Sequence, residues 1–502
     1  MSDTVDVCLV VEGCYPFIAG GVSSWLDWLI RSQPDTIFAV VAITADERPR
    51  VPKFELPENV RRFDTLPLSR CLPRPRLLSP RIDAGALAGM LHGVLVEGDP
   101  AALDALCALV ATPVARGPLG PLGRVGTSAR PSLSDLTCSA PAWEALVQCC
   151  DRISPAASFT DFFWAWRNLV GGLMAVMVAE IPPARAYHAI STGYAGLFAA
   201  RAARETGRRA AITEHGIYTN ERRIDLVSAD WIRDSIETGL AGDPRRADVR
   251  DVYIRAFESF ARIAYGTAER ITTLYGANQS FQRALGAPEA RLRVIPNGIM
   301  LDRFAGIAPA RNERPTVALI GRVVPIKDIE AYIAASHIVK EAIPHVRILL
   351  IGPTDEDTDY EALCRRRVAE LGLEDTIEFT GKVHIPDYLP IIDVLVLTSI
   401  SEAQPLVLLE AGAAGIPSVA TDVGSCREII EGAPDEVPNL GFAGRVAPPM
   451  DAGAIGRGII ELLADPEERR RCGAVMRKRV ETYFTSDLST RRYADLYGEL
   501  LA

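Results

Sequence analysis

Residues 394–420 read VLVLTSISEAQPLVLLEAGAAGIPSVA, and this stretch decides the class of fold. Val394–Leu397 and Ser418–Ala420 are short apolar runs typical of buried strands, and a helical pattern lies between them. A strand, a helix and a second strand in this order predict a parallel β-sheet covered by helices. Ligands of such sheets bind beyond the carboxyl ends of the strands, so the loop 398–405 is a candidate site.

The same alternation of strands and helices runs through both halves of the chain. Further strands are predicted at Val5–Val11, Ile37–Ile43, Ala186–Ile190, Arg209–Thr213, Arg270–Leu274, Leu292–Ile295, Thr316–Ile320, Val346–Ile351 and Thr376–Phe379. Helices are predicted at Val22–Ile30, Ser158–Ala179, 229–265 and Asn278–Leu285. The α/β pattern therefore predicts two Rossmann-like, doubly wound domains.

Two irregular stretches set the predicted domain boundaries. Residues 65–157 are rich in Pro and Gly, a composition typical of insertions and long loops. Residues 308–315, APARNERP, have the polar, proline-bearing composition of a linker. We therefore expect a first domain over 1–307 with an insertion at about 65–157, and a second domain over 308–484.

Composition excludes several classes of protein. Of 502 residues, 48% are hydrophobic and 24% charged, with a formal net charge of −10, which is typical of a soluble globular protein that binds no nucleic acid. The ten cysteines lack metal-ligand spacing, and the most apolar run, Leu169–Ala179, is short for a membrane span. The first residues lack a basic region and a cleavage site, so a cytoplasmic location is expected.

Three loops that follow predicted strands carry candidate binding groups. In 12–21, EGCYPFIAGG, Gly20 and Gly21 let backbone N–H groups approach an anion, although a plain helix-start turn fits equally well. In 213–219, TEHGIYT, His215 can bond a sugar hydroxyl or serve as a structural residue. In 321–327, GRVVPIK, Arg322 and Lys327 suit a diphosphate, and Lys327 is one of only five lysines; a solvated basic turn is the alternative.

The fourth loop carries two carboxylates eight positions apart, Glu402 and Glu410. One lies in the loop and the other about two turns into the helix, where both can face one cleft. Such a pair can accept hydrogen bonds from two sugar rings of a nucleotide sugar, or can be two ordinary surface residues. The acidic run 355–359 lacks the spacing of a calcium loop and reads as a solvated loop, so no metal site is predicted.

The order of these motifs resembles glycosyltransferase family 4. The resemblance rests on GGVS at 20–23, EHG at 214–216, NGI at 297–299, the spacing from Arg322 to Lys327 and the spacing from Glu402 to Glu410. Longer runs, EGCYPFIAGGVSSW, TEHGIYTNERRIDL and TSISEAQPLVLLEAGAAGIP, resemble the glycosyltransferases of Pel exopolysaccharide synthesis. The resemblance implies a GT-B fold, with two Rossmann-like domains facing a cleft and a last helix, about 485–502, that crosses back to the first domain.

The resemblance also implies roles for particular residues. Arg322 and Lys327 match the pair that neutralises the donor diphosphate, Glu402 the group that holds the transferred hexose, and Glu410 the group that binds the ribose. His215 matches the histidine beside the transferred sugar. The other residues implied to bind the donor are Gly20, Gly21, Gln404, Leu406 and Val407, and those implied on the acceptor side are Tyr15, Tyr218 and Arg222.

The implied activity is retaining transfer of a hexose or N-acetylhexosamine from a UDP-sugar to a growing exopolysaccharide, without a metal or other cofactor. Family members usually carry glycine at two loop positions where this chain has Ala403 and Pro405, and Pro405 has no N–H to offer the donor. The implied partners are the UDP-sugar, a polysaccharide acceptor and the integral membrane proteins of a Pel-type synthase, which would recruit the protein to the inner face of the inner membrane. Two alternatives are a UDP-sugar epimerase of the same fold and a nucleotide-binding scaffold that regulates a membrane synthase.

Overall fold

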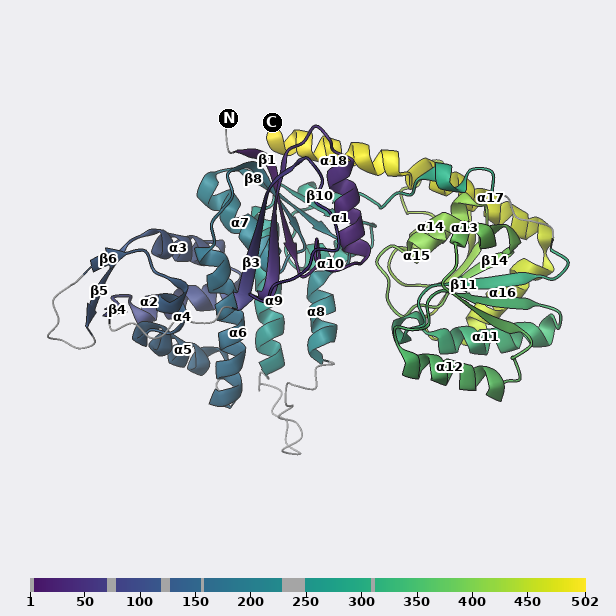
Figure 1. Cartoon of the computed structure of the whole chain (residues 1–502), viewed down its shortest axis with the longest axis horizontal. Coiled ribbons are helices and arrows are strands. Elements are labelled where there is room, and N and C mark those ends of the chain that lie inside the picture. The colour runs from purple at the N-terminus through teal and green to yellow at the C-terminus, as the bar shows by residue number, and fades with distance from the viewer. Residues whose placement is uncertain (1–3, 70–77, 119–126, 155–157, 228–248, 308–311) are drawn as a thin grey trace. The chain divides into compact units, whose positions relative to one another are not determined.

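The computed structural model describes residues 4–69, 78–118, 127–154, 158–227, 249–307 and 312–502. The chain divides into two compact units, each built around a parallel β-sheet with helices packed against it (Figure 1). Unit 1 contains Met1–Thr273, Ser280–Arg293 and Tyr493–Ala502, and unit 2 contains Leu274–Gln279 and Val294–Arg492. The predicted fold class, two Rossmann-like doubly wound sheets, is confirmed.

The sheet of unit 1 has the strand order β10-β9-β8-β7-β1-β2-β3 in the described part of the chain. These strands are β1 (Val5–Glu12), β2 (Phe38–Asp46), β3 (Val60–Ser69), β7 (Ala184–Ile190), β8 (Arg209–Glu214), β9 (Arg270–Thr273) and β10 (Leu292–Val294). The helices around it are α1 (Gly21–Arg31), α6 (Phe159–Val178), α7 (Tyr194–Thr206), α8 (Tyr218–Val227), α9 (Val249–Thr267) and α10 (Asn278–Ala284), with a short 3₁₀ turn, η3 (Glu289–Arg291).

The predicted insertion is folded rather than a set of long loops. Its described part contains a small antiparallel sheet and several helices. These are β4 (Leu78–Pro80), β5 (Val114–Pro118), β6 (Thr127–Ala129), α2 (Ala84–His92), α3 (Pro100–Ala111), α4 (Leu133–Thr137), α5 (Ala140–Ile153) and a π-helical turn, η1 (Gly93–Glu97). Side-chain caps fix several helix starts, because Asp83, Asp99 and Ser139 each accept a hydrogen bond from a first-turn N–H.

The sheet of unit 2 has the order β13-β12-β11-β14-β15-β16. The strands are β11 (Thr316–Ile320), β12 (Arg347–Ile351), β13 (Ile377–Gly381), β14 (Val394–Leu397), β15 (Ser418–Thr421) and β16 (Gly444–Ala447). The helices are α11 (Ile329–Ala342), α12 (Thr358–Glu370), α13 (Ile385–Tyr388), α14 (Leu406–Ala413), α15 (Cys426–Glu431), α16 (Ala452–Ala464) and α17 (Pro466–Tyr483), with 3₁₀ turns η4 (Leu301–Phe304), η5 (Pro325–Lys327) and η6 (Leu389–Ile391).

The strands of unit 2 read as continuous apolar runs because both faces of its sheet are buried. Along β11, Val317 and Leu319 belong to the core on one face, while Ala318 and Ile320 belong to the core on the other. Strands covered by helices on both faces lose the alternation of polar and apolar residues. An uninterrupted apolar run was therefore enough to predict these strands from the sequence.

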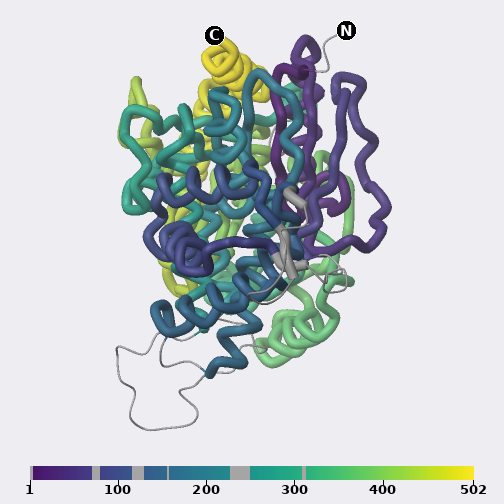
Figure 2. Tube along the Cα trace, turned by 90° about the vertical axis from the view of Figure 1, so that its left-hand side faces the viewer, coloured from purple at the N-terminus to yellow at the C-terminus, as the bar shows by residue number. Residues whose placement is uncertain are grey.

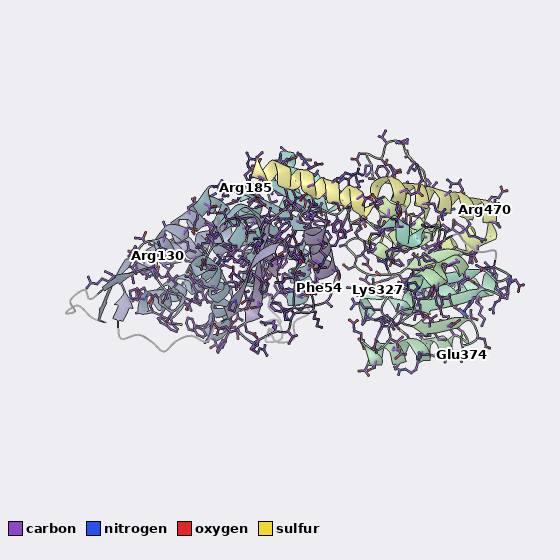
Figure 3. All side chains as sticks on the ribbon, turned by 45° about the horizontal axis from the view of Figure 1, so that its top comes forward. Phe54, Arg130, Arg185, Lys327, Glu374 and Arg470 are labelled. Atoms are coloured by element: carbon purple, nitrogen blue, oxygen red, sulfur yellow. The ribbon has the colours of Figure 1, made fainter. Side chains whose placement is uncertain are left out.

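The last helix, α18 (Ser486–Leu501), begins in unit 2, and its final turns belong to unit 1. Within unit 1, Tyr497 Oη lies 3.0 Å from His188 Nδ1, and the Trp25 ring packs on Tyr493 with centroids 5.6 Å apart. Arg185 bonds both Asp6 of β1 and the Leu501 carbonyl, so the two ends of the described chain lie side by side (Figures 2 and 3).

Five of the described strands lie outside the predicted set: the insertion strands β4, β5 and β6, and the strands β3 and β16 of the two parallel sheets. In β3 only Leu66 is buried, and the strand carries Arg61, Arg62 and Asp64 on its exposed or half-buried positions. Such an edge strand has no apolar run to reveal it. The helix predicted over 229–265 is present as α9 in part, and residues 228–248 lie outside the described residues. No helix among the described residues has the length and apolar character needed to cross a membrane.

Candidate active site

The loops after β11 and β14 bring Lys327 and Glu402 together in unit 2. Lys327 Nζ lies 2.5 Å from Glu402 Oε1, and both side chains are largely buried. Ser399 Oγ donates to the same carboxylate oxygen at 2.7 Å. The pair joins residues 75 positions apart, so it is a product of the sheet topology rather than of local sequence.

Strand pairing explains this meeting. Strands β11 and β14 are parallel neighbours, so their carboxyl ends lie at one edge of the sheet. Two further bonds tie the loops together: Thr398 Oγ1 donates to the Lys327 carbonyl at 2.7 Å, and the Ile400 N–H donates to the Ile326 carbonyl at 2.9 Å. The ammonium group is therefore held on a supported loop.

Arg322 pairs with a different carboxylate, that of Glu356 in the loop after β12. Both side chains are about half exposed, so this pair is weak and easily exchanged for another anion. The acidic run 355–359 is thus more than a solvated loop in this structure, because one of its carboxylates neutralises Arg322.

Helix α14 directs its first turn toward the same strand edge. It starts after Pro405 with no side-chain cap among the described residues, and Leu406 is exposed. The first N–H groups of such a helix, those of Leu406 and Val407 included, carry partial positive charge and suit an anion. Glu410 lies one turn further on, and burial raises the pKa of its carboxyl above the usual range, with Arg303 opposing the shift.

Gln404 serves the loop as a structural residue in this structure. Its Oε1 accepts the Asn297 N–H at 2.7 Å, which ties the NGI segment at 297–299 to the Glu402 loop within unit 2. The Asn297 Oδ1 is buried without a hydrogen-bond partner among the described residues.

In unit 1, Gly20 and Gly21 start helix α1 after β1. Both are exposed, and a side chain added at either position would meet open space, so their backbone is free to approach a ligand. Tyr15 differs from the sequence-based expectation. Its side chain is buried, its hydroxyl donates to Asp27 at 3.2 Å and its ring packs on Phe54, so this structure places it in the scaffold of the loop.

His215 follows β8 and lies edge-on to Trp25, with ring centroids 4.3 Å apart. Its Nε2 is buried and has no hydrogen-bond partner among the described residues. Burial lowers the pKa of its imidazole from 6.5 to about 4. At neutral pH the ring is therefore uncharged, and its Nε2 keeps an unused hydrogen-bonding position.

Tyr218 and Arg222 converge on Glu12, at the end of β1. Tyr218 Oη donates to Glu12 Oε1 at 2.6 Å, Arg222 Nε donates to Tyr218 Oη at 3.1 Å, and the Tyr194 N–H donates to Glu12 Oε2 at 2.9 Å. Sequence reasoning named Tyr218 and Arg222 but missed Glu12 as their common partner. The signal was its position, the last residue of the first apolar strand.

A second buried carboxylate, Glu214, supports the His215 loop and was also missed. It receives hydrogen bonds from the Tyr265 hydroxyl and from Gln282 Nε2, the latter at 3.0 Å. Burial raises the pKa of Glu214. Its position could have indicated a role, because Glu214 is a charged residue at the end of a mainly apolar strand.

Gly424 is a third residue that sequence reasoning missed. It has φ +55°, and a Cβ there would lie 2.3 Å from the Glu402 carbonyl oxygen and 2.4 Å from that of Ala403. The next N–H, of Ser425, donates to the Ala403 carbonyl at 2.8 Å. The Glu402 loop therefore rests directly on a glycine that follows β15.

The lowered pKa of His215 predicts acid sensitivity of unit 1. Its folded pKa lies below the unfolded value, so the unfolded chain binds the extra proton and stability falls as pH drops from 6.5 toward 4. Relative to His215→Gln, the wild type is expected to lose up to about 1.4 kcal/mol per pH unit in this window. Urea unfolding at pH 6.5, 5.5 and 4.5 measures the difference.

The matched control is His345→Gln, at an exposed position of unit 2. The pH-dependent difference from wild type should be seen for His215→Gln and not for this control. Parallel stability curves for wild type and His215→Gln would show that the folded imidazole titrates normally.

No three His, Cys, Asp or Glu side chains gather as a metal site within the described ranges. Charged groups in the loops and helix starts that follow the strands of unit 2 include Arg322, Lys327, Glu356, Glu402 and Glu410. Two cations and an uncapped helix start suit a diphosphate, and carboxylates suit sugar hydroxyls.

Known families match both units. Residues 303–479 match the family described as "Glycosyl transferases group 1", and residues 5–290 match "Domain of unknown function (DUF3492)". Residues 303–479 of unit 2 are therefore similar to group 1 glycosyltransferases, and the two parallel sheets are those of the GT-B fold. Because the match over 5–290 covers more than half of the 502 residues, the chain belongs to the DUF3492 family.

Solved structures share the fold at low sequence identity. Sucrose-phosphate synthase from Thermosynechococcus elongatus aligns with a TM-score of 0.56 and 18% identity over 99% of both chains. HepE from Anabaena, in complex with UDP, aligns with a TM-score of 0.58 and 14% identity over 98% of this chain and 100% of its own. At these identities the likeness establishes the fold alone.

Curated relatives match part of the chain. An exopolysaccharide phosphotransferase of Streptomyces coelicolor is 30% identical over 227 residues, 45% of this chain and 22% of the relative. A GDP-mannose-dependent phosphatidylinositol monomannoside mannosyltransferase of Mycobacterium tuberculosis is 27% identical over 234 residues, 43% of this chain and 57% of the relative. The matches thus span less than two thirds of these relatives.

Proposed function

We propose that this protein is a retaining glycosyltransferase that moves a hexose or N-acetylhexosamine from a UDP-sugar to a growing exopolysaccharide. The Lys327–Glu402 pair at the strand ends of unit 2 is the observation that carries the proposal. It sets a cation for the diphosphate beside a carboxylate for the sugar. Together with the uncapped start of α14, it forms a group suited to a nucleotide sugar.

The chemical work in this proposal is stabilisation of the leaving group. As the bond between the sugar and the diphosphate breaks, negative charge grows on the diphosphate. Arg322, Lys327 and the first N–H groups of α14 supply fixed positive charge where it grows. Glu402 would hold the transferred sugar, Glu410 the ribose, and His215 would offer an uncharged hydrogen bond to the sugar. The scheme needs no divalent metal, so a chelator should leave the rate unchanged.

We further propose a Pel-type role close to that of PelF, with a polysaccharide acceptor and recruitment by integral membrane proteins from the cytoplasmic side. Support comes from the long motifs at 12–25, 213–226 and 398–417. The relatives are named for different donors and acceptors, among them GDP-mannose and L-malate, so their substrates do not transfer to this chain.

A calorimetric screen tests the donor assignment. UDP should bind the full chain at least about ten-fold more tightly than GDP or ADP, and one of UDP-glucose, UDP-N-acetylglucosamine and UDP-N-acetylgalactosamine should bind best. Glu410→Ala should lose most of this affinity because it removes the carboxylate proposed for the ribose. Glu374→Ala, at an exposed position labelled in Figure 3, is the matched control.

Two outcomes would overturn the proposal. Equal, weak affinity for all three nucleotides would remove the UDP assignment. Conversion of a UDP-sugar to its epimer without an acceptor, followed by NMR, would replace transfer with epimerisation.

Gly424→Ala is expected to lower transfer activity by about ten-fold or more. The added methyl group meets the Glu402 and Ala403 carbonyl oxygens, so the loop that holds Glu402 must shift. Gly372→Ala is the matched control, since Gly372 has φ +62° but nothing within 4 Å of the added Cβ. Gly372→Ala has the same free-energy cost for a left-handed backbone, about 1–2 kcal/mol, but the added methyl group collides with nothing. Equal activity in the two variants would show that the Glu402 loop does not depend on Gly424.

A further inference from the structure

Unit 1 contains a pocket of about 590 Å³ that the proposed donor chemistry does not use. It lies between the carboxyl ends of β1, β2 and β3 and the helices α4, α5 and α6, with side chains of α7, α8 and α9 completing it. The volume is that of an ordinary site for a small organic ligand. Its outer wall comes from the insertion.

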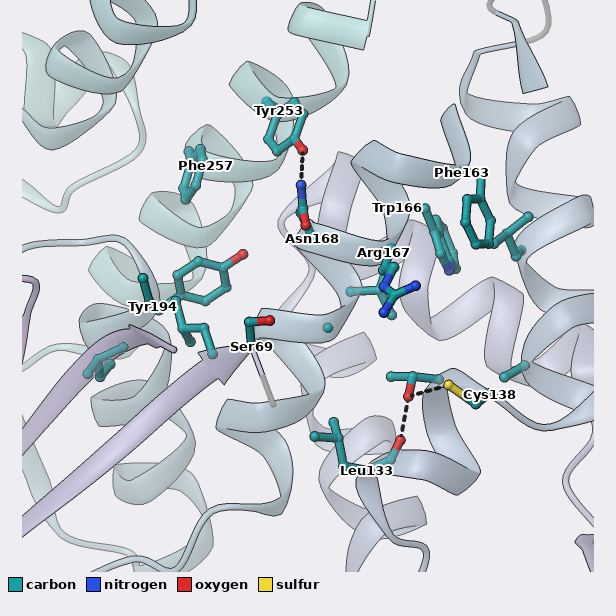
Figure 4. A pocket seen from close by; sticks show the side chains of 18 of the residues that line it. Ser69, Leu133, Cys138, Phe163, Trp166, Arg167, Asn168, Tyr194, Tyr253 and Phe257 are labelled. Atoms are coloured by element: carbon teal, nitrogen blue, oxygen red, sulfur yellow. Dashed lines mark hydrogen bonds between the residues drawn. The ribbon is translucent and has the colours of Figure 1, made fainter. Parts of the chain in front are cut away.

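The lining is mixed at the strand ends and mainly apolar on the side of the insertion and α6. Figure 4 shows Ser69 and Tyr194 on one side and Phe163 and Trp166 on the other, with Arg167 between them. The polar groups of the strand ends are Glu12, Thr44 and Ser69, beside the apolar Ile43, Ala45 and Leu68. The apolar side chains from α4, α5 and α6 are Leu133, Ala142, Trp143, Leu146, Phe163, Trp166 and Val170.

The polar side offers both acceptors and donors to hydroxyl groups. Glu12 lines it with a carboxylate that already accepts the Tyr218 hydroxyl and the Tyr194 N–H, and Arg222, which also lines the pocket, lies 3.7 Å from this carboxylate. Ser69 adds a hydroxyl. A carboxylate oxygen has two lone pairs, so Glu12 can still accept a hydrogen bond from a ligand hydroxyl.

Arg167 supplies donors in the middle of the pocket. Its guanidinium carbon lies over the Trp164 ring, 5.5 Å from the ring centroid, and it forms no ion pair with any of the described residues. A guanidinium group carries five N–H donors. It can therefore bond the oxygens at the junction between a hydroxylated head and an apolar chain.

The apolar side continues onto the surface of the insertion. Trp143 lines the pocket and is 51% exposed, and its ring packs against Phe159 and Phe163 with centroids 5.8 and 6.1 Å apart. Phe159 is 43% exposed. An apolar chain longer than the pocket would thus meet further aromatic surface as it leaves.

We propose that this pocket binds an amphiphilic glycoside, with the sugar head at the ends of β1–β3 and the apolar chain against α5 and α6. That this ligand is the acceptor of transfer rests on the proposed function. The binding itself does not, because all lining residues belong to unit 1 and the donor groups Arg322, Lys327, Glu402 and Glu410 belong to unit 2.

Calorimetry with methyl, hexyl and octyl glucoside, below the micelle concentration and without nucleotide, tests the binding. Affinity should rise by about two- to four-fold for each methylene that enters the pocket. Equal affinity for methyl and octyl glucoside in the wild type would overturn the proposal without recourse to any variant.

Two pocket variants locate the site. Trp143→Ala and Phe163→Ala should weaken octyl glucoside binding by about ten-fold each, because each removes an aromatic wall. Phe281→Ala is the matched control: it alters an aromatic residue of unit 1 in α10, 49% exposed, that does not line the pocket. A loss in Phe281→Ala as large as in the pocket variants would move the binding to another surface and overturn the assignment.

UDP binding by the same samples separates this proposal from the donor assignment. Octyl glucoside binding without UDP binding would uphold the pocket and refute the proposed donor. UDP binding without a dependence on alkyl chain length would uphold the donor and refute the pocket.

Discussion

Lys327→Ala is expected to lower kcat/KM for sugar transfer by about 100- to 1,000-fold, the usual loss when one preorganised charge-stabilising donor is removed. Lys327 Nζ lies on a supported loop, 2.5 Å from Glu402, and its side chain is only 18% exposed. A charge in such a site needs no rearrangement as the diphosphate leaves. Removing it also frees the Glu402 carboxylate, whose negative charge then opposes the leaving group.

Lys340→Ala provides the control for this loss. Lys340, in the last turn of α11, also belongs to unit 2, but among the described residues its ammonium group bonds only the Gly372 carbonyl, just after α12. Initial rates with saturating acceptor and thermal unfolding of both variants separate a loss of catalysis from a loss of fold. A Lys327→Ala enzyme within three-fold of wild type, on the order of 1 kcal/mol or less, would remove Lys327 from the mechanism.

Arg479→Met is expected to destabilise the protein by about 3–5 kcal/mol, since it leaves a buried carboxylate without its partner. Arg479 and Glu436 have side chains 1% and 4% exposed and form a two-point ion pair, with distances of 2.6 and 2.9 Å. The guanidinium group also donates to the carbonyls of Ile429, Ile430 and Gly441. Burial alone would raise the pKa of Glu436, but the hydrogen bonds from Arg479 lower it.

A second arginine of helix α17 is the control for this effect. Arg471 pairs with Glu468, but its side chain is 50% exposed, so Arg471→Met should cost less than about 1 kcal/mol. Urea unfolding gives both values. The double variant Arg479→Met, Glu436→Gln should recover part of the loss, because no unpaired charge remains; equal losses in the two single arginine variants would contradict the argument.

The predicted strands of both units agree with the structure because their signal is local. A strand of a helix-covered parallel sheet is apolar throughout, as Val394–Leu397 and Thr316–Ile320 show. The same pattern predicted that Lys327 and Glu402 lie in loops after strands, but only the pairing of β11 with β14 in the folded structure brings the two side chains together. Parallel strands end at one edge, so loops that follow neighbouring strands come together wherever they stand in the chain.

Other features of the fold depend on contacts between segments that are distant in the chain, and no local sequence pattern predicts them. Residues 65–157 have the composition of loops, yet most of their described part is helical. Side-chain caps such as Asp99 and Ser139 start these helices, and their apolar faces pack on the rest of unit 1. Tyr15 stands in a candidate binding loop, but it turns into the interior toward Asp27. Loop composition says nothing of which way a side chain turns.

The amino-acid sequence by itself determined that this protein has two parallel sheets and that its charged loops follow their strands, because both properties rest on periodicity and strand order. Tertiary structure alone decided which groups share a site. Glu12 meets Tyr218 across 206 positions, and Glu436 meets Arg479 across 43. The amphipathic pocket likewise exists only where the insertion closes over the ends of β1, β2 and β3. Such meetings depend on which surfaces pack together, and packing is a property of the folded chain rather than of any single segment.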